Sequence, residues 1–164
     1  MSILIIQTGG TIDKIYPKSI NGWGFEIGDA AVHRILSKKE LSVDYRIISA
    51  CKKDSTQLNE NDRKNILNIC QKSSEEQIII THGTDTILDT AKFLSIIENK
   101  TIVLTGSFLP HAFKNSDAEF NIGMAISAVQ LLNKGIYVSL NGIIAGPNEL
   151  QPLGPAIIPF KDTY

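Results

Sequence analysis

The sequence predicts a three-layer α/β fold in which helices cover both faces of a doubly wound, mostly parallel sheet. Short runs rich in Ile, Val and Leu recur along the chain, each near a cluster of Gly, Ser or Asn. Between these runs lie segments of helical length with apolar residues spaced three and four apart. Because parallel strands need long crossovers, this alternation favours right-handed βαβ units. With 164 residues, the whole chain 1–164 is expected to form a single domain.

The first expected strand runs from Ser2 to Gln7 and stops at the glycines of Thr8-Gly9-Gly10-Thr11. Its continuous apolar run indicates a strand that is buried on both faces. The Pro-rich segment 151–159 is expected to form an irregular, packed tail. Further buried strands are expected at 43–50, 77–81, 101–105 and 135–140.

Helical patterns lie between these strands, and Asp29 and Asn59 are the expected N-caps of the first two helices. The four expected helices are 29–38, 61–72, 85–97 and 117–132. In sheets of this kind, which include Rossmann-like and flavodoxin-like domains, ligands bind beyond the carboxyl ends of the strands. A functional site is therefore expected in the loops 8–11, 51–59, 82–86 and 106–115.

Composition and charge argue against several classes of function. Lys and Arg number 16 against 17 Asp and Glu, so the net charge of −1 provides no field for a nucleic acid or a membrane. No apolar run reaches the length of a membrane span, and Ile3–Ile6 is too short for a signal peptide. Cys51 and Cys70 form no disulfide framework or metal motif, which favours a cytoplasmic protein without a metal or other cofactor. Glycine motifs for nucleotide phosphates are absent from the sequence.

Three of the expected loops place small hydroxyl residues beside glycine or at a strand end. They are Thr8-Gly9-Gly10-Thr11, Asp54-Ser55-Thr56-Gln57 and Thr81-His82-Gly83-Thr84-Asp85-Thr86. Glycine allows a ligand to approach the backbone closely, and hydroxyl groups can hold a carboxylate. Such loops suit a small polar ligand whose ammonium group binds Asp85. Taken singly, the first loop is also compatible with a simple turn, and Thr84 or Asp85 with a helix cap.

The loops also carry a resemblance to a known family. Thr8-Gly9-Gly10-Thr11-Ile12 and Thr81-His82-Gly83-Thr84-Asp85-Thr86 resemble the two signatures of the bacterial-type asparaginase/glutaminase family. Two further stretches, Val103-Leu104-Thr105-Gly106-Ser107 and Ser116-Asp117-Ala118-Glu119-Phe120-Asn121, are similar to the strand, loop and helix that follow in the family. The similarity runs in the same order from about Ile3 to Asn141.

This resemblance implies hydrolysis of a side-chain amide through an acyl-enzyme. Thr11 matches the nucleophile and Thr84 the second catalytic threonine. A hydroxyl needs an activating base at neutral pH, and the developing oxyanion needs preorganised donors. Backbone N–H groups around Gly10, Thr11 and Gly83 are the expected donors.

The resemblance also assigns groups that bind the substrate. Asp85 matches the acid that holds the α-ammonium, and Ser55, with Thr56 beside it, matches the position that holds the α-carboxylate. Tyr16 lies where the family has a mobile lid with a tyrosine that polarises the nucleophile. Fewer residues separate Tyr16 from the first signature than is usual in the family. Residues 16–28 are therefore expected to form a lid.

An alternative interpretation of this segment makes Trp23 and Phe25 simple packing anchors.

The chain departs from the family in two ways. Family members are about twice as long, because a second domain follows and reaches into the active site of a partner subunit. The general-base lysine of the family is expected within 142–155, a stretch that contains no lysine. Lys14, His82 and His111 are the candidate replacements, and each is also compatible with a purely structural role.

Three functions remain open at this stage. The first is an asparaginase-type amidohydrolase that acts on a small amide and forms a homo-oligomer through the tail 151–164. The second is a weak or inactive domain that binds an amino acid as a sensor or regulator. The third is an amidotransferase subunit acting on glutamate charged on tRNA, which the near-neutral charge disfavours. Retention of both threonines favours the enzyme.

Overall fold

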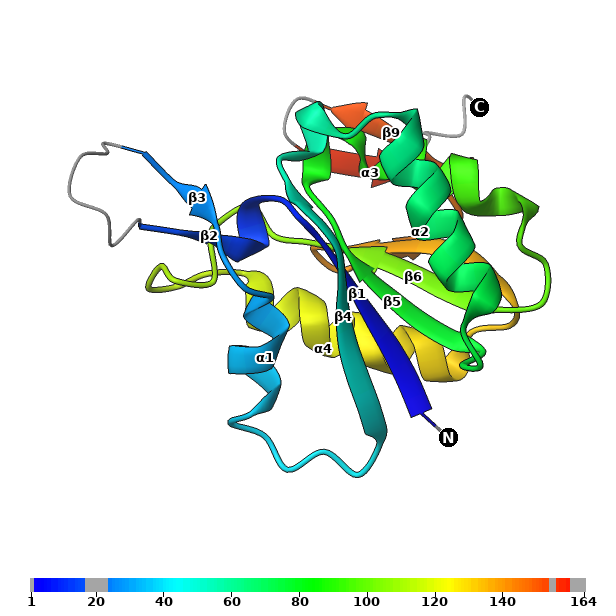
Figure 1. The fold of residues 1–164 in the computed structure, drawn as a ribbon, viewed down its shortest axis with the longest axis horizontal. Coiled ribbons are helices and arrows are strands. Elements are labelled where there is room, and N and C mark those ends of the chain that lie inside the picture. Colours follow the sequence, from blue (N-terminus) through cyan, green and yellow to red (C-terminus); the bar gives the residue numbers. More distant parts are fainter. Residues whose placement is uncertain (1, 17–23, 154–155, 160–164) are drawn as a thin grey trace.

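The computed structural model describes residues 2–16, 24–153 and 156–159, and these contain a six-stranded sheet. The strand order is β4-β1-β5-β6-β7-β8, and every neighbouring pair is parallel except the antiparallel pair β7 and β8 (Figure 1). The strands are β1 (Ser2–Gly9), β4 (Asp44–Lys53), β5 (Gln77–Thr81), β6 (Thr101–Thr105), β7 (Gly135–Leu140) and β8 (Ile143–Ala145). The predicted mostly parallel sheet is confirmed.

Helices cover both faces of the sheet and complete the predicted three layers. One face carries α2 (Glu60–Lys72) and α3 (Ile87–Phe93), and the other carries α1 (Ala31–Leu36) and α4 (Ala118–Leu131) (Figure 1). Short 3-10 helices follow three of the strands: η1 (Thr11–Asp13) follows β1, η2 (Ser55–Gln57) follows β4 and η3 (Thr84–Thr86) follows β5. A fourth, η4 (Leu94–Ile96), follows α3. The segment predicted as one helix over 85–97 is thus divided into η3, α3 and η4.

The first strand shows why apolar runs form this sheet. Leu4 and Ile6 join the core under α2 and α3, whereas Ile3 and Ile5 join the core on the α1 and α4 side. All four side chains are at most 2% exposed. Because successive side chains of a strand point to opposite faces, a strand buried on both sides needs an unbroken apolar run.

The first turns of α1 and α2 are stabilised in different ways. Asn59 caps α2 with a reciprocal capping box to Asp62, as predicted. Asp29 does not cap α1: its N-cap is Ala30, and the Asp29 carboxylate lies 2.7 Å from Lys52 Nζ. The first free N–H of α1, at Ala31, instead donates to the Asp13 carboxylate at 2.6 Å. The N-cap prediction for Asp29 was wrong because a residue 18 positions away satisfies this donor.

Two small antiparallel ladders differ from the predictions. Segment 151–159 is not irregular, because β9 (Leu150–Leu153) pairs with β10 (Ala156–Pro159). Near the expected lid, β2 (Lys14–Ile15) pairs with β3 (Glu26–Ile27). Residues 17–23 of the expected lid lie outside the described residues.

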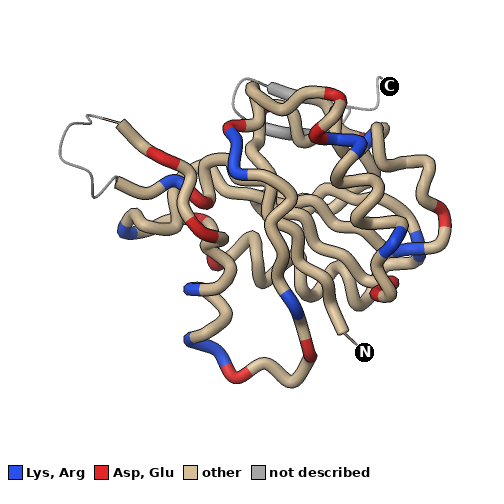
Figure 2. Tube along the Cα trace, in the orientation of Figure 1, with Lys and Arg blue, Asp and Glu red and all other residues tan. Residues whose placement is uncertain are grey.

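The topology places a switch point between β1 and β5. The chain passes from β1 to β4 on one side and then crosses to β5 on the other side of β1. In such sheets the crevice at the carboxyl ends of these two strands is the preferred ligand site. Figure 2 shows acidic and basic residues interspersed along the chain. Among the described helices, none is long and apolar enough to cross a membrane.

Candidate functional site

Three loops meet at the carboxyl ends of β1, β4 and β5. A methyl group placed on Gly10 would lie 2.5 Å from the Gly83 Cα atom, so the backbones of the loops after β1 and β5 are in direct contact. A methyl group on Gly83 would in turn lie 2.6 Å from the Ser55 Oγ atom. The structure therefore brings together Gly10, Gly83 and Ser55, which the sequence places far apart.

Glycine is required in the first loop by its backbone conformation. Gly9 and Gly10 have φ angles of 107° and 81°, which side chains of L-residues rarely adopt. The Gly10 N–H donates to the Lys53 carbonyl at 2.9 Å and joins this loop to the end of β4. The Thr8 hydroxyl donates to the Thr81 carbonyl at 2.9 Å and joins β1 to β5. These two hydrogen bonds therefore join the end of β1 to the ends of β4 and β5 at the switch point.

Ser55 is the buried hydroxyl of the site. Its side chain is 1% exposed, and its Oγ atom has no hydrogen-bond partner in the described structure. The neighbouring backbone is fixed, because the Thr86 hydroxyl donates to the Ser55 carbonyl at 2.8 Å. Asp54 accepts hydrogen bonds from the N–H and hydroxyl of Thr56. A buried hydroxyl without a partner is a group that a polar ligand can satisfy.

Thr11 and Thr84 directly follow Gly10 and Gly83, the two glycines whose backbones are in contact. Thr11 begins η1 and Thr84 begins η3, and both side chains are half-buried. Among the described residues, neither hydroxyl has a hydrogen-bond partner, and Asp85 is exposed without an ion-pair partner. Neither Thr84 nor Asp85 forms a side-chain cap on the helical segment that follows. The cap interpretation of these two residues is therefore not supported.

Lys14 faces the Ser55 loop but is engaged in an ion pair. Its Nζ atom lies 2.9 Å from a carboxylate oxygen of Asp54. The hydrogen bond from Lys14 holds the pKa of Asp54 below its usual value, so the carboxylate stays charged. An ammonium in such a pair has no lone pair with which to accept a proton. Its described role is to join η2 to β2.

His82 is fully buried, and both ring nitrogens are engaged. Its Nδ1 atom lies 2.8 Å from the Gly83 carbonyl, and its Nε2 atom lies 2.8 Å from the Thr90 hydroxyl. Arg63 Nε donates to the same hydroxyl at 3.1 Å. Burial lowers the pKa of His82 to about 4, so the ring is neutral at physiological pH. His82 therefore holds the Gly83 loop in place.

His111 approaches the first loop through its backbone, whose N–H donates to the Ile12 carbonyl at 3.2 Å. Its Nδ1 atom is buried without a described partner, and its Nε2 atom lies 3.6 Å from Glu119. Burial lowers the pKa of this imidazole as well. The described contacts place His111 beside η1 but give no contact to the Thr11 side chain.

Tyr16 lies at the end of the described part of the expected lid. Its ring is 65% exposed and packs edge-on against Phe25 with a centroid distance of 5.2 Å. Phe25 also packs against Phe113 at 5.5 Å. This contact supports the interpretation of Phe25 as a packing residue, whereas Trp23 lies outside the described residues. No described contact joins Tyr16 to Thr11.

The family is identified by comparing nearly the whole sequence with known protein families. Residues 2–152 match the family described as "Asparaginase, N-terminal". The chain belongs to the asparaginase family. It is 28% identical over 162 residues to a glutaminase-asparaginase of Acinetobacter glutaminasificans, a match that covers 91% of this chain and 49% of the relative.

One further relative agrees with this assignment, and one solved structure shares the fold. An L-asparaginase of Thermococcus kodakarensis is 32% identical over 145 residues, which cover 85% of this chain and 44% of the relative. The crystal structure of L-asparaginase I from Vibrio cholerae superposes with a TM-score of 0.82 at 20% identity, over 96% of this chain and 51% of that one. The chain thus spans about half the length of the curated asparaginase relatives it matches.

Sequence reasoning missed a buried carboxyl group beside the asparaginase signature. Asp13 is 1% exposed and accepts hydrogen bonds from the Gln7 amide at 3.1 Å and from the Ala31 N–H. Burial raises its pKa to about 6. The position two residues after Thr11 was its only sequence signal. Among the described residues, no group of His, Cys, Asp and Glu has the arrangement of a metal site.

Proposed function

We propose that this protein is an amidohydrolase that cleaves the side-chain amide of a small amino-acid amide. The observation that carries the proposal is the meeting of the three loops at Gly10, Gly83 and the unpartnered hydroxyl of Ser55. The glycines allow the three loops to approach one another closely, and the two threonines stand directly after them. Family membership supports the same chemistry.

In the proposed reaction, the Thr11 oxygen attacks the amide carbon and its proton passes to a base. Backbone N–H groups near Gly10, Thr11 and Gly83 would stabilise the oxyanion. The C–N bond then breaks, the nitrogen takes up a proton and ammonia leaves, so that an ester to Thr11 remains. Water cleaves this ester, releases the acid and restores the hydroxyl. Thr84 is the proposed second catalytic threonine, and Tyr16 the proposed lid residue.

The proposed substrate carries both charges of an amino acid. Its α-carboxylate would accept hydrogen bonds from the Ser55 hydroxyl and from Thr56, and its α-ammonium would pair with Asp85. The exposed Asp85 carboxylate has no described ion-pair partner, which leaves it available to a cation. A neutral amide without these charges would lose both contacts.

A second candidate is an amino-acid binding domain without turnover. The observation that favours it is the state of the candidate bases, because Lys14 is paired with Asp54 and both nitrogens of His82 are engaged. A binding protein needs Ser55 and Asp85 but not a base for Thr11. A sensor or regulator of this kind would bind the amino acid and release no ammonia.

Ammonia release from asparagine and glutamine separates the two candidates. We expect activity in the wild type, loss of at least about 100-fold in Thr11→Ala, and partial retention in Thr11→Ser, which keeps the hydroxyl. Ser55→Ala is expected to raise KM more than it lowers kcat. Absence of turnover, together with a rise in Tm on addition of asparagine, would instead establish the binding domain.

Three further properties are part of the proposal. The chain is expected to act as one domain over 1–164, which limited proteolysis would test by yielding no stable smaller fragment. A homo-oligomer is expected, and a monomeric mass in light scattering at working concentration would contradict it. The free thiols of Cys51 and Cys70 favour a cytoplasmic location, which cell fractionation would test.

A further inference from the structure

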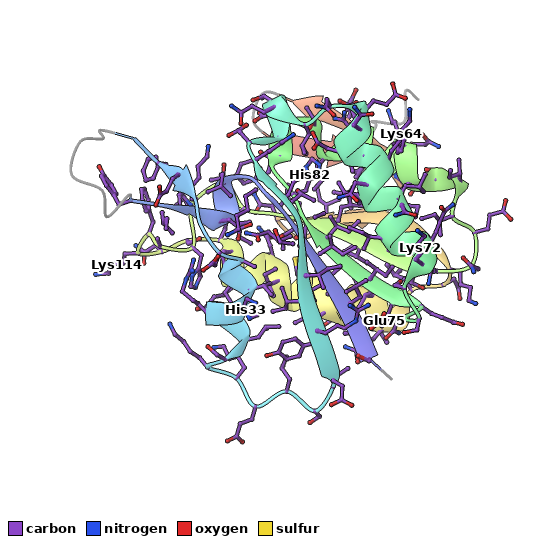
Figure 3. All side chains as sticks on the ribbon, viewed as in Figure 1. His33, Lys64, Lys72, Glu75, His82 and Lys114 are labelled. Atoms are coloured by element: carbon purple, nitrogen blue, oxygen red, sulfur yellow. The ribbon has the colours of Figure 1, made fainter. Side chains whose placement is uncertain are left out.

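A cavity lies between α1 and the edge strand β4, on a part of the molecule to which the proposed function assigns no role. It has a volume of about 490 Å³. The described residues that line it come from the end of β1, from β4 and from the segment 29–34. Figure 3 labels one of them, His33, on α1. Cavities of this volume are large enough for a small organic ligand.

The cavity is lined by an excess of cationic and hydrogen-bond donating groups. Arg34, Lys52 and His33 border it together with the Ser49 hydroxyl, whereas Asp29 is the one carboxylate among the described lining residues. Asp29 is already paired with Lys52 at 2.7 Å. The charge of Arg34 is therefore left without a counterion on the cavity wall.

Arg34 is the unusual member of this group. Its guanidinium Nη2 atom is buried and has no hydrogen-bond partner among the described residues, and no described carboxylate lies within ion-pair distance of the group. A guanidinium remains charged at all physiological pH values. A buried donor on a permanent cation is costly to leave unsatisfied, so such a group favours an anionic partner.

The nearest buried carboxyl group does not supply that partner. Asp13 is 1% exposed and accepts hydrogen bonds from Gln7 and from the Ala31 N–H, so its oxygens are already engaged. The Gln7 amide that borders the cavity donates to Asp13 and to the Gly28 carbonyl. Asp13 attracts the Arg34 charge through space, but neither residue is described as forming a hydrogen bond with the guanidinium.

We propose that the cavity between α1 and β4 binds a small anion, a carboxylate or a phosphate, whose oxygens are held by Arg34 with support from Lys52, His33 and Ser49. A planar guanidinium suits both carboxylate and phosphate oxygens. The bound anion would also compete with Asp29 for Lys52. This site is separate from the loops that carry Thr11, Ser55 and Thr84.

Calorimetric titration with inorganic phosphate and with succinate, at constant ionic strength, tests the proposal. We expect saturable binding of at least one anion to the wild type. Arg34→Gln is expected to weaken it at least tenfold, and Lys52→Gln several-fold. Lys64→Gln is the matched control, because Lys64 is also an exposed lysine paired with one carboxylate, Glu60, but on α2 (Figure 3). The control is expected to change the Kd less than twofold.

The two anions distinguish the source of the ligand. Binding of phosphate alone assigns the site to a phosphorylated ligand, and binding of succinate alone assigns it to a carboxylic acid. The proposal is overturned if neither anion binds saturably at concentrations up to about 20 mM. Equal weakening by Lys64→Gln and Arg34→Gln would likewise overturn it, because it would show only nonspecific attraction.

An NMR measurement on the wild-type protein tests the proposal even if Arg34→Gln fails to fold. Imidazole NMR signals of His33 are expected to shift with anion concentration along the same isotherm as the calorimetry, whereas those of the buried His82 are expected to stay unchanged (Figure 3). Unchanged His33 signals at saturating anion would place the binding elsewhere and overturn the proposal.

Discussion

The close approach between Gly83 and Ser55 in the candidate site makes Gly83 sensitive to a single added carbon. In Gly83→Ala the new methyl group would lie 2.6 Å from Ser55 Oγ and 2.7 Å from Ser55 Cβ, so Ser55 must move. Overpacking of this kind costs about 1–3 kcal/mol of stability. We expect Tm to fall. We also expect the change in Tm caused by the proposed binding of asparagine to disappear, because the proposed carboxylate site at Ser55 is displaced.

Gly123 provides the control for this prediction. It lies within α4, and a methyl group there meets no atom within 4 Å. Since glycine is about 1 kcal/mol less favourable than alanine inside a helix, Gly123→Ala is expected to raise Tm. A fall in Tm for Gly123→Ala, or normal asparagine binding by Gly83→Ala, would contradict this account of the site.

At the scale of elements, a chain of side chains joins α2 and α3 to the loop that contains Gly83. Arg63 on α2 donates to Thr90 on α3, and Thr90 contacts His82, whose other nitrogen contacts the Gly83 carbonyl. Thr90→Val keeps the shape of the side chain but leaves the buried His82 Nε2 atom without a partner. We expect it to lower the free energy of unfolding by about 1–3 kcal/mol, measured by urea denaturation.

Thr90→Ser separates the hydrogen bond from packing. It keeps the hydroxyl and removes one buried methyl group, which is worth about 0.8 kcal/mol. The serine variant is therefore expected to recover most of the free energy of unfolding that the valine variant loses. Equal loss in both variants would mean that packing around Thr90, and not its hydroxyl, holds the Gly83 loop.

Local sequence patterns predicted the helices and strands well. They predicted less well the contacts that cap the helices. The apolar runs predicted β5, β6 and β7 with the observed bounds, because a doubly buried strand must be apolar throughout. Asn59 could be predicted as a cap because its partner Asp62 is three residues away. Asp29 failed as a cap because Asp13, which is distant in sequence, satisfies the first donor of α1.

At the scale of the whole molecule, the position of the site was predictable and its internal contacts were not. Parallel topology requires the loops after β1, β4 and β5 to share one edge, so Gly10, Ser55 and Gly83 were expected to be near one another. The pairing of Lys14 with Asp54 and the burial of Asp13 depend on long-range packing, which residue patterns do not encode. The pairing of β9 with β10 was not predicted, because both segments contain proline, which is uncommon within strands.

Two buried groups with opposite effects are expected to shape the pH dependence of stability. The folded pKa of Asp13 is about 6 against an ordinary 3.8, so its contribution is full below pH 3.8 and is lost as pH rises through 6. The folded pKa of His82 is about 4 against an ordinary 6.5, so its contribution is full above pH 6.5 and is lost as pH falls through 4. Each contribution is roughly 3 kcal/mol.

Because the two contributions oppose each other between pH 4 and 6.5, they nearly cancel in the wild type. Asp13→Asn removes one of them and keeps an acceptor for the Ala31 N–H. Relative to the wild type, we expect this variant to lose roughly 3 kcal/mol more stability on acidification from pH 6.5 to 4, measured by urea denaturation. Asp44→Asn, at an exposed position, is expected to follow the wild type. Parallel pH profiles for the wild type and Asp13→Asn would show that the Asp13 carboxyl does not titrate differently in the folded and unfolded chains.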